Sequence, residues 1–238
     1  MIGLGTAINI GLIIAGSLCG LAFGRFMKEN LKQTLIMVSG IIVLLLGMSG
    51  AMQYMLVIVN GTLQTTGPML MIISMVAGAV IGELIDLNRW ITVFGDWVKA
   101  KTGNTGDPQF THAFITASLT FTVGAMGVLG SIQDGLTGNY QTLLLKGILD
   151  GIIVMVMVSS MGKGALFSFI PVGITQWIIT AMAHIAAPLM TPSAIDNLSY
   201  VGSILIFCVG IDLIWPGKIR IANLLPAIFV AMGLTFLL

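Results

Sequence analysis

The sequence predicts an all-α integral membrane protein that crosses the bilayer several times, and two observations lead to this prediction. Of 238 residues, 57% are hydrophobic and only 8% are charged, whereas a soluble domain usually carries about 25% charged residues. Apolar runs close to the ~20 residues that cross the hydrocarbon core recur along the whole chain. The net charge of +1 gives no indication of a nucleic-acid partner.

About eight apolar segments are predicted to span the membrane, within a single transmembrane domain that covers residues 1–238. No polar stretch is long enough for a separate soluble domain. Because Arg25 and Lys28 follow the first apolar stretch, that stretch is expected to be a retained helix and not a signal peptide. The predicted spans are Ile2–Phe23, Leu35–Val59, Met69–Leu87, Phe110–Ile132, Leu143–Met161, Ala165–Met190, Tyr200–Trp215 and Ile221–Leu238.

The basic residues alternate between the predicted loops. Nine of the ten Lys and Arg residues lie in the loops after the first, third, fifth and seventh spans, and the tenth, Lys146, lies within a span. The loops after the second, fourth and sixth spans contain none. The positive-inside rule then places the basic loops in the cytoplasm and both termini outside.

The longest loop is expected to form an amphipathic helix over residues 88–103. Trp90, Phe94 and Trp97 recur there at helical spacing, with charged residues between them. Such a helix suits the membrane interface, where Trp is favoured. Two interpretations are open, a simple connector and a regulatory or lipid-sensing element.

Glycines in the spans predict tight helix packing. Small residues four apart let two helices approach closely, within one chain or between the subunits of a homodimer. The glycine spacing of the first two spans recurs in the third and fourth, which is consistent with an internal repeat of one helical pair. The motifs are Gly16/Gly20/Gly24, Gly78/Gly82 and Gly147/Gly151, together with Gly-x₂-Gly-x₂-Gln at 47–53 and at 127–133.

The fourth span carries three glycines within seven residues, Gly124, Gly127 and Gly130, after Thr122. A helix that breaks there would expose backbone carbonyls and amides, which are tolerated at membrane depth only beside protein or water and often bind ions or solutes. The alternative is a continuous helix whose glycines form a groove for a neighbouring helix.

The fifth span contains two charges, Lys146 and Asp150, which lie on one helical face because they are four residues apart. A lone charge at mid-membrane costs about 2.5–3.5 kcal/mol on insertion scales, and pairing removes much of this cost. The pair is either a self-neutralised structural element or part of a polar vestibule. In the vestibule, Asp150 would bind a cation or proton, and Lys146 would gate it or attract an anion.

Other polar residues are predicted at a similar depth, namely Asn9, Gln133, Asp134 and His184. Together with Lys146, Asp150 and the fourth span they would form one outward-facing pocket. A second polar set falls near the opposite span ends, where the interface solvates most of its members; it comprises Glu83, Asp86, His112, Asp212 and Asn223.

The chain lacks the common metalloprotease, hydrolase, Walker and dinucleotide motifs. We therefore expect no enzymatic activity, cofactor or metal site. The sequence favours a secondary transporter or channel for a small polar solute or ion, surrounded by membrane lipids. The alternative is a membrane scaffold or sensor that does not transport and has an unknown partner.

The run TVGAMGVLGSIQDGLTGNYQTLLLKGILDG, with GALFSFIPVGITQ after it, resembles the bacterial inner-membrane family of domain of unknown function 554, the YqgA- and YdfK-like proteins. The N-terminal GTAINIGLIIAGSLCG and the late GIDLIWPGKIRIANLLPAI are similar to the same family, so the resemblance covers nearly the whole chain. It implies a small inner-membrane protein, sometimes described as a transporter. It supplies no substrate and no functional residue. Members of the family usually carry Asn near the position of Asp212, so the resemblance implies no charge-specific role for Asp212.

Overall fold

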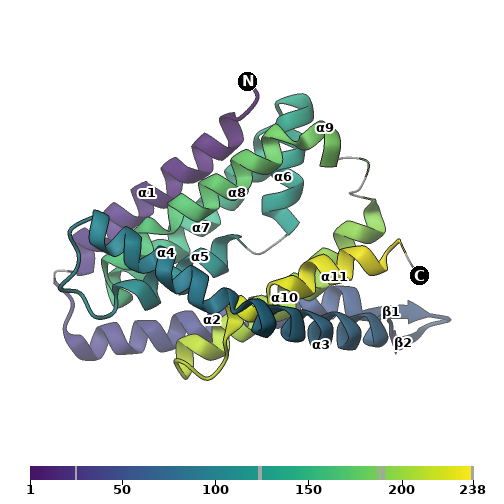
Figure 1. The fold of residues 1–238 in the computed structure, drawn as a ribbon, viewed down its shortest axis with the longest axis horizontal. Helices are drawn as coiled ribbons and strands as arrows, with labels where there is room; N and C mark the ends of the chain where they lie inside the picture. Colours follow the sequence, from purple (N-terminus) through teal and green to yellow (C-terminus); the bar gives the residue numbers. More distant parts are fainter. Residues whose placement is uncertain (25, 123–124, 187, 189–190, 237–238) are drawn as a thin grey trace.

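The computed structural model describes residues 1–24, 26–122, 125–186, 188 and 191–236. Helices dominate the fold, and one β-hairpin interrupts them (Figure 1). The longer helices are α1 (Leu4–Gly24), α2 (Glu29–Met55), α3 (Pro68–Ile85), α4 (Leu87–Lys101), α5 (Phe110–Thr122), α6 (Ala125–Thr137), α7 (Gln141–Met161), α8 (Phe169–Ala181) and α10 (Pro192–Ile214). The shorter elements are β1 (Leu56–Val59), β2 (Thr62–Thr65), η1 (Lys163–Ser168), α9 (Ala183–Ala186), η3 (Ile221–Leu224) and α11 (Pro226–Leu234).

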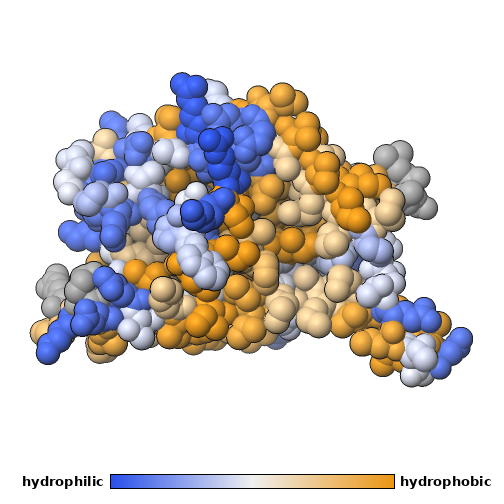
Figure 2. All heavy atoms as spheres, turned by 90° about the horizontal axis from the view of Figure 1, so that it is seen from below, coloured by the Kyte–Doolittle hydropathy of each residue, from blue (hydrophilic) through white to orange (hydrophobic). Residues whose placement is uncertain are grey.

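The molecule has two distinct ends. The loops that follow α1, α4 and α7 meet in one groove that contains Lys32 and Lys163, and we call this the basic end. The β-hairpin lies against the start of α10 at the other end, which we call the hairpin end (Figure 1). Between them, Figure 2 shows hydrophobic side chains across the centre of one face, with hydrophilic side chains gathered toward its left and at its lower right.

Glycine seams join the first three long helices to the second half of the chain. Gly16 faces the backbone carbonyl of Gly151, so α1 runs parallel to α7 in direct backbone contact, and a Cβ at Gly16 would collide with that carbonyl. In the same way α2 packs on α10, and α3 packs on η3 and α11. The predicted close packing at the glycines is confirmed. Because these seams lie within one chain, the homodimer stays a prediction.

Among the described residues, six helices are long and apolar enough to cross a membrane by themselves. A seventh candidate span is α5 with α6, which qualify only as a pair and are inclined at 60° to each other, as in a broken span or a re-entrant loop. An eighth would require the shorter apolar helix Ile221–Leu234 to cross as well. The all-α polytopic class is therefore confirmed, with six or seven candidate spans where the sequence predicts about eight.

The structure differs from the predicted spans around α2 and α10. The second span ends at Met55, and residues 56–65 form a hairpin whose turn residues, Asn60 and Gly61, have φ values of 51° and 77°. Positive φ at both positions is the geometry of a type I′ turn, for which Asn-Gly is the preferred sequence. The seventh span begins at Pro192, because Thr191 caps the helix through the amide of Ala194 at 3.2 Å.

Helix α4 occupies most of the segment that the sequence predicts as amphipathic. Its inner face buries Val98 against Phe110 and Phe114, while Trp90 and Trp97 are 65% and 54% exposed. Such exposed indole rings suit the headgroup region. The location of α4 at the membrane interface stays a prediction.

Candidate solute site between α2, α5, α7 and α10

The Lys146–Asp150 pair lies on the inner face of α7. The Lys146 ammonium donates a hydrogen bond to Asp150 Oδ2, and the two side chains are only 8% and 9% exposed. Since α7 begins at Gln141, Asp150 lies about 14 Å along a helix of about 31 Å. The carboxylate therefore lies close to the middle of its span.

A cavity of about 330 Å³ opens beside this pair, between α2, α5, α6, α7 and α10. Lys146 and Asp150 are the only charged residues among the described residues that line it. The other polar lining residues are Gln53, Tyr54, Thr120, Ser199 and Ser203, and the apolar wall includes Leu46, Phe121, Leu149, Ile153 and Ile206. This combination of a mostly apolar wall with a few convergent polar groups is typical of small-molecule sites.

Two buried amides lie behind the ion pair. Asn9 of α1 and Gln176 of α8 are 0% and 3% exposed. The Asn9 amide lies beside the Asp150 carboxylate. The Gln176 amide has no hydrogen-bond partner within the described part of the chain. A buried amide group left without a partner costs about 1–3 kcal/mol, so the Gln176 amide calls for a physical reason.

Gly127 places the second amide next to Lys146. A Cβ at Gly127 would lie 3.3 Å from Lys146 Cε and 3.9 Å from Gln176 Nε2. The absence of a side chain at this position leaves a small space that both the Lys146 stem and the Gln176 amide border. Gly127 also lines the cavity, as the sequence predicts for the glycines of the fourth span.

The fourth predicted span is not one straight helix, since α5 and α6 are inclined at 60°. Thr122 is the last residue of α5, and its buried Oγ1 has no partner among the described residues. Gly124 lies outside the described residues. The bend therefore adjoins the wall of the cavity that Thr120, Phe121, Met126 and Gly127 form.

Three predicted site residues make packing contacts instead of lining the cavity. A Cβ at Gly130 would lie 2.9 Å from the Leu143 side chain, so this glycine fits α6 against α7. Gln133 accepts a hydrogen bond of 2.7 Å from Thr142 Oγ1. Asp134 is fully buried and accepts the Gly5 amide at 3.0 Å, so it caps the first turn of α1.

His184 does not join the cavity either, because it is exposed on the short helix α9. At the basic end, Glu83 forms an exposed ion pair with Arg220 at 3.1 Å. Asp86 caps α4 at the Arg89 amide, and the Asn223 side chain accepts the Asn88 amide at 2.6 Å. These contacts give Glu83, Asp86 and Asn223 structural roles at the ends of their helices.

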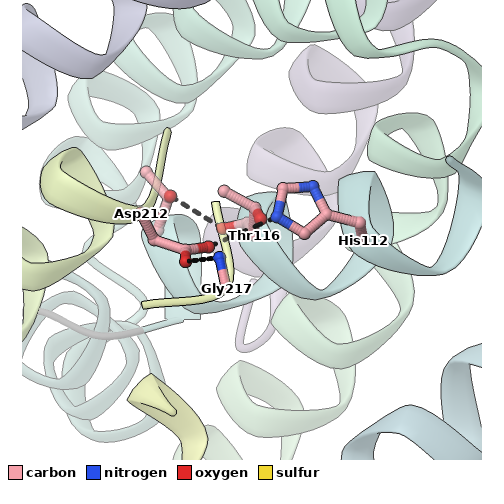
Figure 3. Close-up of polar contacts among 5 residues, drawn as sticks. His112, Thr116, Asp212 and Gly217 are labelled. Carbon is pink, nitrogen blue, oxygen red and sulfur yellow. Dashed lines mark hydrogen bonds and ion pairs between the residues drawn. The ribbon is translucent and has the colours of Figure 1, made fainter. Parts of the chain in front are cut away.

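His112 and Asp212 form a separate polar contact toward the basic end. His112 Nε2 lies 3.3 Å from Asp212 Oδ2, and Asp212 Oδ1 accepts the Gly217 amide at 2.7 Å. Figure 3 shows the Asp212 carboxylate between Gly217 and the His112 ring, with Thr116 beside them. The two side chains line a pocket of about 380 Å³ that Thr116 also borders.

The central cavity lies between this pocket and a third one. At the hairpin end, a pocket of about 360 Å³ shares Gln53 and Tyr54 with the cavity. Toward the basic end, one turn of α5 separates Thr120 in the cavity from Thr116 in the His112 pocket, and Thr120 Oγ1 donates to the Thr116 carbonyl at 2.7 Å. Three pockets therefore follow α10 from one end of the molecule to the other.

Comparison with known proteins places the chain in a family. A family model described as "Protein of unknown function (DUF554)" matches residues 4–236. The chain belongs to this family. It is 27% identical over 235 residues to the "Uncharacterized membrane protein YdfK" of Bacillus subtilis (strain 168), with 98% of this chain and 96% of YdfK covered.

A second relative of this DUF554 protein is the "Uncharacterized protein YqgA" of Escherichia coli (strain K12). The identity is 24% over 240 residues, with 98% of this chain and 96% of YqgA covered. No solved structure matches the chain. The resemblance that the sequence motifs indicate is therefore confirmed, and membership of the DUF554 family brings with it no described activity.

Proposed function

We propose that this protein is a secondary transporter or channel that carries a small polar solute or ion through the cavity of Lys146 and Asp150. The observation that supports this best is the position of the pair, which is buried near mid-span and faces a cavity of about 330 Å³. Buried ion pairs add little net stability compared with well-packed apolar residues of similar volume. Charged groups inside a membrane bundle usually mark a solute or ion pathway.

The series of pockets along α10 supports the same function. Ser193 and Asp196 line the pocket at the hairpin end, Ser199 and Ser203 line the cavity, and Asp212 lines the pocket at the basic end. From Ser203 to Asp212 the helix rises only about 14 Å. In this arrangement the cavity adjoins the pocket at the hairpin end, and the turn of α5 from Thr116 to Thr120 closes the route to the basic end.

The orientation belongs to the same proposal. The basic end faces the bacterial cytoplasm, because basic loops are retained on that side. In this proposal Ile221–Leu234 crosses as an eighth span, and the even number of spans leaves both termini outside. Solute would then enter the cavity from outside, past Gln53 and Tyr54. Release to the cytoplasm would require α5 to move away from the cavity, since transporters open a fixed site to the two sides in turn by moving one group of helices against another.

Flux into proteoliposomes tests the proposal. Wild-type protein is compared with the double variant Lys146→Met/Asp150→Asn, which removes both charges without leaving one unpaired. The matched control is Lys101→Met/Asp96→Asn, at exposed positions on α4. We expect uptake of at least one labelled solute or ion by wild type and by the control, and loss of uptake in the first variant. Uptake that is equal in all three proteins would refute the role of the pair.

A membrane scaffold or sensor is the second candidate, and the exposed face of α4 favours it. Trp90, Val93 and Trp97 are each more than half exposed on a helix at the side of the bundle. Trp90→Ala/Trp97→Ala separates the two functions. Loss of a co-purifying partner with flux intact would favour the scaffold, whereas unchanged association of every partner would count against it.

A further inference from the structure

We propose that the solute is a small zwitterion, which opens the Lys146–Asp150 pair by presenting a carboxylate to the ammonium of Lys146 and a cationic amine to Asp150. This inference rests on the proposed function and specifies the class of solute. It follows from the balance of charge in the cavity, from the two amides behind the pair and from the character of the cavity wall.

The charge balance of the cavity favours a solute that carries both signs. Lys146 and Asp150 neutralise each other and are the only charges on the wall that the structure describes. An anion that binds Lys146 would leave Asp150 buried without a counter-charge, and a cation that binds Asp150 would do the same to Lys146. Uncompensated buried charge is strongly unfavourable. A zwitterion replaces the Lys146–Asp150 pair by two neutral pairs, one between its carboxylate and Lys146 and one between its amine and Asp150. No charge is then left without a partner.

The amides of Asn9 and Gln176 provide what the opened pair needs. Asn9 neighbours Asp150, and Gln176 Nε2 and Lys146 Cε both lie within 4 Å of the Cβ position at Gly127. An amide group donates through its nitrogen and accepts through its oxygen, so Asn9 can donate to the carboxylate and Gln176 can accept from the ammonium. In the closed pair Asn9 already lies beside the carboxylate, whereas the Gln176 amide lacks a partner among the described residues. The hydrogen bond of Gln176 to the ammonium would form only when a solute separates the two charges, and this gives a reason for an unsatisfied amide in a buried position.

The cavity wall limits the size and polarity of the zwitterion. At about 330 Å³ the cavity is near the lower end of the usual range for ligand pockets. Leu46, Leu149 and Ile206 line it together with Ser199 and Ser203. The charged groups of the solute would therefore lie against α7, while a short apolar portion would contact α2 and α10.

Binding of matched probes to purified full-length protein in nanodiscs tests the inference. The probes are glycine, β-alanine and L-valine, each with the amine that lacks its carboxylate and the acid that lacks its amine; for L-valine these are isobutylamine and isovalerate. We expect at least one zwitterion to bind at least tenfold tighter than both of its counterparts, which corresponds to about 1.4 kcal/mol. The inference fails if a singly charged counterpart binds as tightly, or if none of the three zwitterions binds.

Variants of the pair give a readout that a purely structural pair would not change. Lys146→Met leaves a carboxylate and should invert the preference toward the amine probe, whereas Asp150→Asn should invert it toward the acid probe. If a single variant does not fold, the double variant Lys146→Met/Asp150→Asn, which leaves no buried charge, should fold and lose the zwitterion at least tenfold. Unchanged preference in the variants that fold would overturn the inference.

The two proposals fail in different ways. If a singly charged probe binds and is carried in a manner that depends on Lys146 and Asp150, transport stands and the zwitterion is wrong. If a zwitterion binds with the expected preference and wild-type protein carries neither that zwitterion nor any other solute, the binding site stands and transport is wrong.

Discussion

A double-mutant cycle on Lys146 and Asp150 measures how far the pair is removed from water. The single variants are Lys146→Met and Asp150→Asn, and the third protein carries both substitutions. Each substitution has a similar volume to the residue that it replaces, so differences in free energy of unfolding report mainly on charge. Additivity is expected to fail, because the two side chains share a hydrogen bond.

The expected magnitudes follow from the burial of the pair. With 8% and 9% side-chain exposure, the charge left by a single substitution has little access to bulk water, and breaking such a pair costs about 3–5 kcal/mol. The adjacent cavity can hydrate the remaining charge in part, so we expect about 3 kcal/mol for each single variant. The double variant should lose about 1 kcal/mol or less, which makes the coupling about 5–6 kcal/mol.

Unfolding of the four proteins in detergent micelles, followed by tryptophan fluorescence, gives the cycle. If each single variant loses less than about 1 kcal/mol, the pair behaves like an exposed ion pair, and the cavity wall is open to water. If the double variant is as unstable as the sum of the single variants, the two charges do not interact. Either result would refute the argument that the pair is buried and mutually neutralised.

Three further predictions concern packing, capping and orientation. In thermal melts, Gly16→Leu should destabilise the protein by about 3 kcal/mol or more, because the new side chain meets the backbone of α7. The control Gly11→Leu should be neutral, because a Cβ at Gly11 meets no atom within 4 Å. Asp134→Ala should lower stability by about 1–2 kcal/mol through loss of the α1 cap, and it should leave solute binding unchanged; weakened binding would place Asp134 in the site. In a background without native cysteines, Ser193→Cys in intact cells should react with an impermeant maleimide and Lys101→Cys should not; the reverse pattern would invert the orientation.

Local patterns predicted the parts of the site that one helix or one loop determines. Lys146 and Asp150 share a face of α7 because of helical periodicity alone, and three closely spaced glycines marked the place where α5 and α6 diverge. The Asn60–Gly61 turn has a local signal too, since Asn-Gly between β-branched residues favours a hairpin. The sequence nevertheless predicts a span through Val59, because the apolar residues before the turn do not distinguish the end of a helix from a strand.

The remaining parts depend on which helices meet. Gln176 carries no distinguishing signal in its own sequence, and it becomes relevant only because α8 packs against α6 near Gly127. Gln53 and Ser203 reach one cavity because the glycine seam brings α2 and α10 together. Asp134 is the converse case, since its sequence position suggests the pocket, and in the fold its carboxylate caps α1.

The seam between α1 and α7 also has a consequence for biogenesis. Ser159 Oγ donates to the Gly20 carbonyl across 139 residues of chain, so α1 leaves the ribosome well before its partner. At about 5–20 residues per second, the first helix waits roughly 7–28 s in the membrane without α7 to cover its glycine face. A truncated chain that ends before α7 cannot form this contact, so the glycine face of its first helix stays uncovered.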